Sequence, residues 1–193
     1  VTNIDHFGNV TKQYFHQGNE SATQVGEYLD HPAKINLPYK TEIFDNQNTF
    51  FQTTINKWER TELPSLSGPQ DAKRNFVRIE KTVAQTFDGN SSHKDTAQTF
   101  TYNATNGNLE KQVNLGEVTL TDISTLGTND VGTDKITTDY TYVDNAATFS
   151  ALPAQVTHTD ASGVKVQEAK YYYDNQPFGT AKSGNLTKQE RLI

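Results

Sequence analysis

The sequence predicts an all-β fold, a strip of antiparallel hairpins, and three observations predict it. The 193 residues include 27 Thr and 17 Asn, which favour strands and turns respectively. Apolar and polar residues alternate with a period of two in several segments, and turn-forming clusters separate these segments. No segment carries the apolar stripe of an amphipathic helix. We therefore expect an antiparallel repeat β-sheet made of a strip of hairpins.

The clearest strand runs from Phe76 to Phe87, where Val77, Ile79 and Val83 share one parity with Phe87. The same alternation predicts further strands, about ten in all, including segments 10–14, 100–102, 109–115, 136–142 and 164–172. Clusters of Asp, Asn, Ser and Gly predict the turns between them, at 5–9, 45–48, 88–92, 103–108, 160–163 and 183–185.

We expect one β-rich segment over residues 1–193, with long loops near 16–32, 61–73 and 121–134. Pro64 and Pro69 interrupt the second of these loops, and Gly127 and Gly132 lie in the third, which offers almost nothing to bury. The chain contains no Met, and we expect it to be a piece excised from a longer polypeptide.

Composition limits the possible functions. Seventeen Lys and Arg against 23 Asp and Glu give a net charge of -6, which argues against nucleic acid as a partner. The sequence contains no run of 18 apolar residues, which is the length that would predict a membrane span. The absence of Cys excludes disulfides and thiolate chemistry. Hydrophobic residues make up only 33% of the chain, so the 10% that are aromatic must supply much of the core.

Candidate sites for chemistry are few. The five His residues lack the spacing of a zinc site. Segment 88–95 places oxygen ligands at alternate positions but has His93 where a calcium loop needs Gly. We expect no catalytic residue, no metal and no cofactor. Exposed aromatic side chains could instead form a stacking surface for sugar, and the candidates are Trp58, Tyr171, Tyr172 and Tyr173. Tyr171 and Tyr173 should share one face of a strand and Tyr172 the other, a pattern that suits core packing better.

A degenerate repeat runs through the chain. An aromatic residue is followed by Asp or Asn, a turn, Gly-Asn and a strand, in Tyr102-Asn103 with Gly107-Asn108-Leu109 and in Tyr173-Asp174 with Gly184-Asn185-Leu186. The first turn, from Asp5 through Gly8-Asn9-Val10-Thr11, is similar. In each unit a ring points inward, an acid or amide caps the turn, and Gly takes a positive φ. Such hairpin halves must stack to bury their rings.

On these motifs the chain resembles the RHS or YD-repeat family, most closely the repeat shell of the B component of bacterial insecticidal toxin complexes. The resemblance implies that the antiparallel repeat β-sheet forms part of a spiralling, hollow shell that encloses a C-terminal toxin or effector polypeptide. It implies neighbouring repeats of the same parent chain as partners, a secreted or extracellular bacterial location, and no enzymatic activity. The alternative is a carbohydrate- or receptor-binding β-module that uses Trp58 or Tyr171, Tyr172 and Tyr173.

Overall fold

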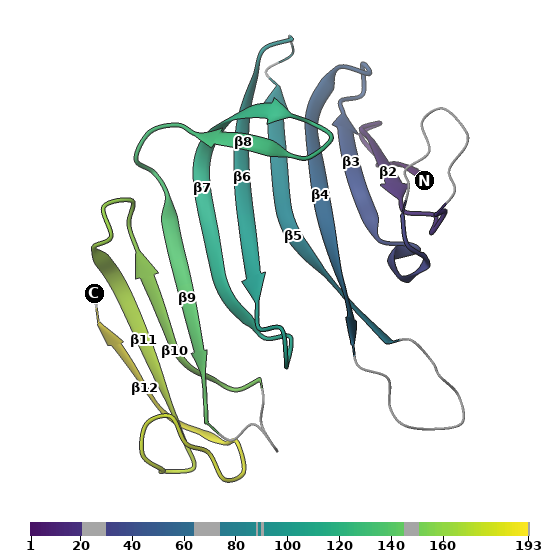
Figure 1. Ribbon diagram of the computed structural model, residues 1–193. Helices are drawn as coiled ribbons and strands as arrows, with labels where there is room; N and C mark the ends of the chain where they lie inside the picture. Colours follow the sequence, from purple (N-terminus) through teal and green to yellow (C-terminus); the bar gives the residue numbers. More distant parts are fainter. Residues whose placement is uncertain (21–29, 64–73, 88, 90, 145–150, 193) are drawn as a thin grey trace, which may run out of the picture. The chain divides into compact units, whose positions relative to one another are not determined.

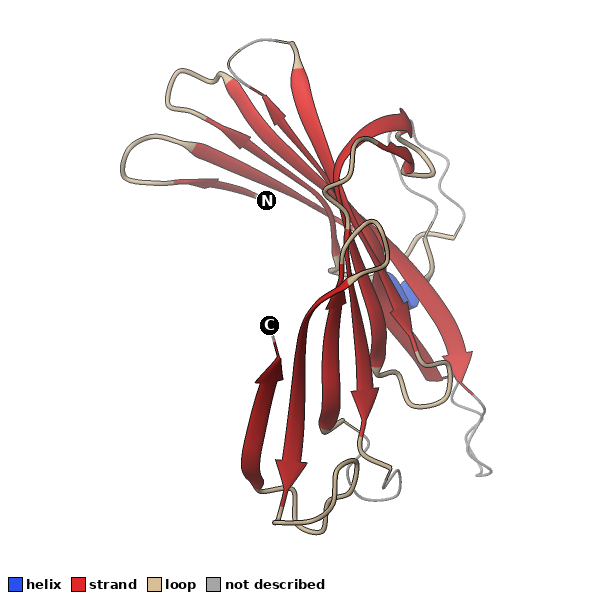
Figure 2. Cartoon of the chain, turned by 90° about the vertical axis from the view of Figure 1, so that its left-hand side faces the viewer, coloured by secondary structure: helices blue, strands red, loops and turns tan. Residues whose placement is uncertain are grey.

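The structure is a computed structural model, and it describes residues 1–20, 30–63, 74–87, 89, 91–144 and 151–192. The predicted all-β antiparallel fold is confirmed, because the described chain consists of strands and loops with a single short 3-10 turn (Figures 1 and 2). The turn is η1 (Pro32–Lys34), and the strands are β1 (Thr2–Ile4), β2 (Val10–Phe15), β3 (Pro38–Phe44), β4 (Phe50–Leu63), β5 (Arg74–Phe87), β6 (His93–Tyr102), β7 (Leu109–Asp122), β8 (Gly127–Asp130), β9 (Ile136–Tyr142), β10 (Pro153–Thr159), β11 (Lys165–Tyr173) and β12 (Leu186–Leu192).

Strand order in the sheet follows chain order. Each strand from β1 to β7 pairs with the next, and the path continues through β9, β10, β11 and β12 while β8 pairs with β7. Most turns between neighbours are short, so the contacts that build the sheet join hairpin partners. The chain divides into two compact units, and we describe each by itself. Unit 1 comprises residues 1–97 and 117–129, and unit 2 comprises 98–116 and 130–193.

Unit 1 has a thin core on one face of the longest hairpin, β4 with β5. Ile55 lies opposite Val83 in the register of this pair, and both side chains are buried. Ala97 of β6 and Val118 of β7 are buried as well. Alternation along each strand places these residues on one face, as the period-two pattern predicts.

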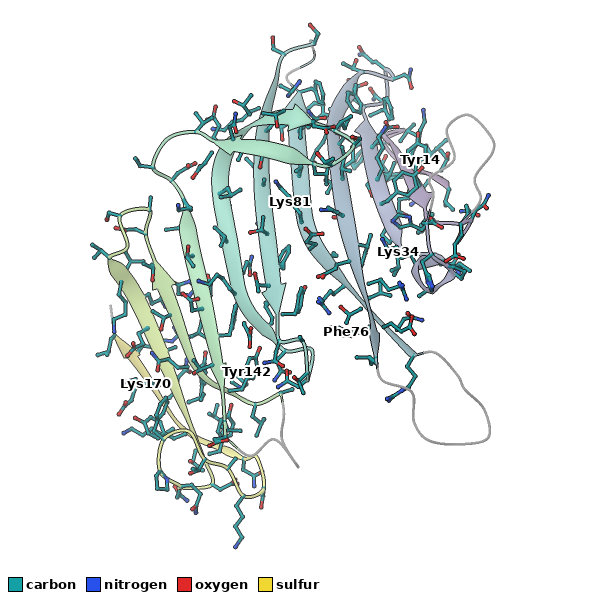
Figure 3. The ribbon with its side chains drawn as sticks, in the orientation of Figure 1. Tyr14, Lys34, Phe76, Lys81, Tyr142 and Lys170 are labelled. Carbon is teal, nitrogen blue, oxygen red and sulfur yellow. The ribbon has the colours of Figure 1, made fainter. Side chains whose placement is uncertain are left out.

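The segment 121–134, which the sequence predicts to be a loop, is corrected by the structure. It contains the end of β7 and the whole of β8, and Figure 1 shows this hairpin crossing β5 and β6. Leu126 in the turn between the two strands is only 3% exposed, and Thr128 accepts a hydrogen bond from Lys81 Nζ at 2.7 Å. The many Thr residues serve as strand formers here, and the buried Leu126 and the hydrogen bond from Lys81, which Figure 3 labels, help to hold the hairpin on the sheet.

The other two expected loops are described only in part. Residues 61–63 continue β4, and 64–73 lie outside the described residues. In the segment 16–32, residues 21–29 lie outside the described residues, and Pro32 begins η1. The described ends of this excursion are joined by a main-chain hydrogen bond of 3.1 Å from Asp30 N to Asn19 O.

Unit 2 packs around the chain's second aromatic repeat. Tyr173, at the end of β11, is buried with Val143, Ala154 and Ala181, and Tyr171 packs against this cluster. The Tyr173 hydroxyl donates to the main-chain oxygen of Pro153 at 2.9 Å. A buried tyrosine normally needs such a partner for its hydroxyl. The ring therefore joins β11 to the start of β10.

Three hairpin turns have the same geometry, at 5–9, 45–49 and 160–164. In each, an Asp carboxylate accepts the main-chain N–H groups two and four residues further on at 2.7 to 2.9 Å, from Phe7 and Asn9, Gln47 and Thr49, and Ser162 and Val164. The residue three positions after the Asp has a positive φ, of 87° at Gly8, 63° at Asn48 and 84° at Gly163. These turns occur where the sequence predicts them.

We expect Gly163→Ala to lower the free energy of unfolding by about 1 kcal/mol, because an L side chain disfavours a positive φ. No atom lies within 4 Å of the added Cβ, so the cost is conformational rather than steric. Gly163→Asn should cost clearly less, since Asn48 already occupies the equivalent position of the β3–β4 turn. Urea denaturation of the two variants and the parent chain measures this difference. Equal stability of the Ala variant and the parent would contradict the assigned turn.

Candidate functional site

The turn after β11 is organised by one carboxylate. Asp174 Oδ2 accepts the main-chain N–H groups of Lys182, Ser183 and Gly184 at 2.7 to 2.9 Å. Its Oδ1 accepts the main-chain N–H of Asn185 at 3.0 Å. These bonds, with the one from Ser183 the strongest, hold the pKa of Asp174 far below its usual value. The aromatic-Asp repeat is thus a structural device: Tyr173 anchors the strand end and Asp174 closes the loop.

Tyr171, Tyr172 and Tyr173 divide between the two faces of β11, as their spacing predicts. Tyr173 belongs to the buried cluster of unit 2, and the partly buried Tyr171 packs against it. Tyr172 donates to Glu190 Oε2 at 2.7 Å and meets the ring of Phe178 edge-on at 5.6 Å. Lys188 Nζ lies 4.8 Å from the Tyr172 ring centroid. The three rings do not form one continuous stacking surface.

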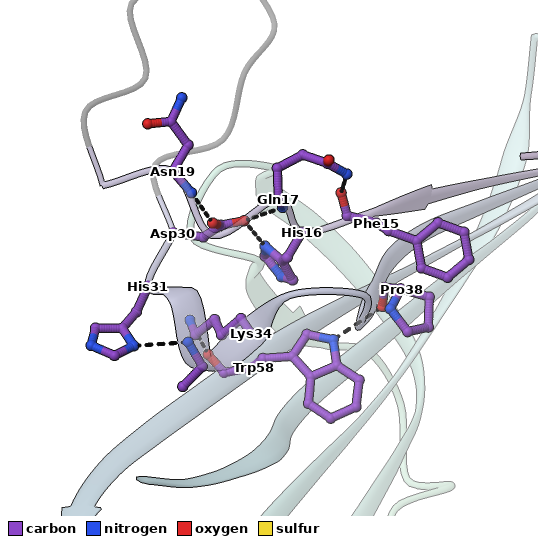
Figure 4. A network of polar contacts seen from close by, with 10 residues as sticks. Phe15, His16, Gln17, Asn19, Asp30, His31, Lys34, Pro38 and Trp58 are labelled. Atoms are coloured by element: carbon purple, nitrogen blue, oxygen red, sulfur yellow. Dashed lines mark hydrogen bonds and ion pairs between the residues drawn. The ribbon is translucent and has the colours of Figure 1, made fainter. Parts of the chain in front are cut away.

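Trp58 lies in β4 of unit 1 and lines a pocket of about 160 Å³. The indole is half-buried, and its Nε1 donates to the main-chain oxygen of Pro38 at 3.0 Å. Lys34 of η1 donates from Nζ to the main-chain oxygen of Trp58 at 2.7 Å (Figure 4). The pocket is therefore built by β3, β4 and η1, and by the turn that follows β7. Trp58 and the tyrosines lie in different units, each described by itself.

A buried, hydrogen-bonded His–Asp pair borders this pocket. Asp30 Oδ2 lies 2.7 Å from His16 Nδ1, and the same carboxylate accepts the main-chain N–H groups of Gln17 and Asn19 (Figure 4). His16 also packs its ring on Tyr39, with centroids 5.2 Å apart. Burial lowers the pKa of His16, although Asp30 opposes this shift. The pair joins the two ends of the segment 16–32 next to the pocket.

Another buried carboxylate, Asp95 of β6, joins three strands. It accepts hydrogen bonds from the Gln85 side chain at 3.2 Å and from the main-chain N–H of Leu120 at 3.3 Å, and it pairs with His93. Asp95 ends the segment 88–95, in which the sequence has oxygen ligands at alternate positions, and residues 88 and 90 of that segment lie outside the described residues. Within the described part of the chain, no three His, Asp or Glu side chains are placed to hold a metal ion. The same residues contain no helix with the length and hydropathy needed to cross a membrane.

Comparisons with known proteins bear on the fold. No family model matches the sequence, and no curated protein matches it. Among solved structures, the chain is similar to one in a crystal structure of TcdB2-TccC3-Cdc42, with a TM-score of 0.60 and 9% sequence identity. The similarity covers 95% of this chain and 13% of that chain. The two share a fold. This chain therefore spans a small part of the protein whose fold it shares.

The residues predicted as ligand-binding are only partly brought together. Tyr171 and Tyr173 meet in a core, whereas Trp58 lines a pocket with Lys34, a residue that the sequence analysis did not single out. Lys34 ends the short 3-10 turn that Pro32 begins, and no pattern in the sequence indicates its role. Whether any of the four aromatic residues binds a ligand stays a prediction.

The lowered pKa of Asp174 predicts a pH dependence of stability. A carboxyl whose pKa is lower in the folded than in the unfolded state contributes stability above the unfolded value near 3.8, and this contribution is lost as pH falls through the folded value. Asp174→Asn should therefore destabilise the chain at pH 7, and its difference from the parent should shrink between pH 5 and pH 2. Chemical denaturation at several pH values measures this difference. Asp130→Asn, at an exposed position, serves as the control, and a pH-independent difference for Asp174→Asn would contradict the assignment.

Proposed function

We propose that this chain is a non-catalytic structural segment of a YD-repeat shell that encloses and shields a toxin or effector polypeptide. The observation that carries the proposal is the order of the strands, which follows the chain from β1 through β7 and from β9 to β12, with β8 alone off the path. A wall built this way can be lengthened by adding hairpins at either edge without changing those already present.

Both edge strands support this proposal. Within the described chain, β1 pairs with β2 alone and β12 pairs with β11 alone. Exposed edge strands offer unpaired N–H and C=O groups that can accept another strand. Each edge strand also exposes an apolar side chain: Ile4 on β1 is 64% exposed, and Leu192 on β12 is 57% exposed. Neighbouring repeats of a parent chain would satisfy both edges in the same way.

The fold shared with a chain of the TcdB2-TccC3-Cdc42 structure supports the same proposal, as does the aromatic-Asp repeat. The proposal places the segment in a secreted or extracellular bacterial protein. Its partners would be neighbouring repeats and an enclosed C-terminal polypeptide, and the segment itself would need no cofactor. Its task is mechanical, because closely paired strands exclude proteases from what lies behind them.

Limited proteolysis of the full-length parent tests this function. We expect residues 1–193 and a downstream polypeptide to resist cleavage together. Tyr173→Ala should expose that polypeptide, since loss of a buried ring and its hydrogen bond costs about 3 kcal/mol. Phe7→Ala is the matched control, because Phe7 is 67% exposed. Rapid cleavage of the downstream polypeptide in the unaltered parent would contradict the proposal.

A further inference from the structure

The pocket beside Trp58 has a composition that the shell function does not require. The residues that line it include His16, Lys34, Tyr39, Lys57 and Leu126. The volume of about 160 Å³ corresponds to roughly five water molecules. A space of this size suits a small molecule or one inserted side chain.

The titratable side chains that line this pocket are of basic types, although the chain is acidic. The net charge of the protein is -6, yet the described residues that line the pocket include two Lys and one His and no Asp or Glu. Lys57 is matched by Glu80 of β5, with Nζ 3.0 Å from Oε1, and both side chains are partly exposed. His16 is matched by Asp30. Lys34 is the third basic residue that lines the pocket.

Lys34 has a neutral hydrogen-bond acceptor. Its Nζ donates to the main-chain oxygen of Trp58, and in the described part of the chain it forms no salt bridge with a carboxylate. An ammonium group has three protons to donate, so this bond leaves capacity for an incoming anion. Burial lowers the pKa of Lys34, and nearby Arg60 and Lys57 lower it further while Asp30 opposes them. A bound anion would offset the unfavourable burial of this charge.

The apolar residues that line the pocket limit which kind of anion fits it. Ile55 and Leu126 are 6% and 3% exposed, and the Trp58 indole lies beside them. We propose that this pocket binds a carboxylate that carries a short apolar group, with the charge at Lys34 and the apolar group against Ile55 and Leu126. The ligand is either a small free organic acid or an acidic side chain of a polypeptide. The inference does not depend on the proposed shell function.

The chain contains its own probe for this site. Trp58 is the only Trp in the sequence and lines the pocket. We expect sodium propionate to change its fluorescence saturably in the millimolar range, as expected for so few contact atoms. Propionamide has nearly the same shape without the charge, and sodium chloride matches the ionic strength. Neither should give the saturable change.

Variants at the cations test the assignment. Lys34→Met keeps an unbranched apolar stem and should weaken propionate binding by about tenfold or more, while Lys34→Arg should retain most of it. Lys57→Gln disturbs no main-chain bond and should weaken binding by a smaller factor. Lys182→Gln, at an exposed position of unit 2, is the matched control and should leave binding unchanged. Thermal unfolding of each variant establishes that it is folded. If Lys34→Met fails to fold, the Lys57 variant and the parent titration still test the site.

Two peptides distinguish the sources of the carboxylate. Binding of acetyl-Gly-Glu-Gly-amide, but not of acetyl-Gly-Gln-Gly-amide, would identify an acidic side chain as a ligand. Binding of propionate alone would indicate a free acid, and either result supports the proposal. Three results would overturn it: no saturable response to propionate, an equal response to propionamide or a neutral sugar, or equally tight binding of inorganic phosphate.

Discussion

The fold depends on one recurrent interaction, the hydrogen bonding of a turn carboxylate to the main-chain N–H groups of its own turn. Asp5, Asp45 and Asp160 form this contact in three equivalent hairpins, and Asp174 forms a larger version of it. At the β7–β8 turn, Asp122 accepts hydrogen bonds from the hydroxyls of Ser124 and Thr125 and from the main-chain N–H of Ser124, and these lower its pKa to about 2. At these described turns the closure is local, so the two strands that each turn joins are paired, and the turn contributes to setting their register.

This local closure compensates for a thin core. Buried apolar side chains are few, and polar residues share the interior with them, including Thr53, Gln85 and Glu168. Each of these has hydrogen-bond partners within the sheet, as Glu168 does with Gln155 and two lysines. A single sheet needs little apolar material if its turns are preformed and its buried polar groups are satisfied. Such a sheet is suited to forming a wall, and the carboxylate pocket beside Trp58 is a separate feature upon it.

Sequence reasoning succeeds where the physics is local. Alternation from Phe76 to Phe87 predicts most of β5, and the Asp and Gly clusters predict the turns, because both depend on residues a few positions apart. It fails for β8, because residues 121–130 fold onto the sheet through contacts of Leu126 with apolar residues that are distant in sequence. The Trp58 pocket was missed for the same reason. Trp58 and Lys34 are 24 positions apart and come from different elements, and the alternation within β4 gives no sign of η1.

The proposed shell function requires that both edge strands of this chain pair with further strands of a longer parent. Amide hydrogen exchange in β12, measured on residues 1–193 alone and within the full-length parent, tests it most directly. The account predicts that the N–H groups facing β11 are protected in both. The alternate N–H groups on the open edge should exchange rapidly in the isolated chain and be protected in the parent. Equally fast exchange at the open edge in both proteins would contradict it.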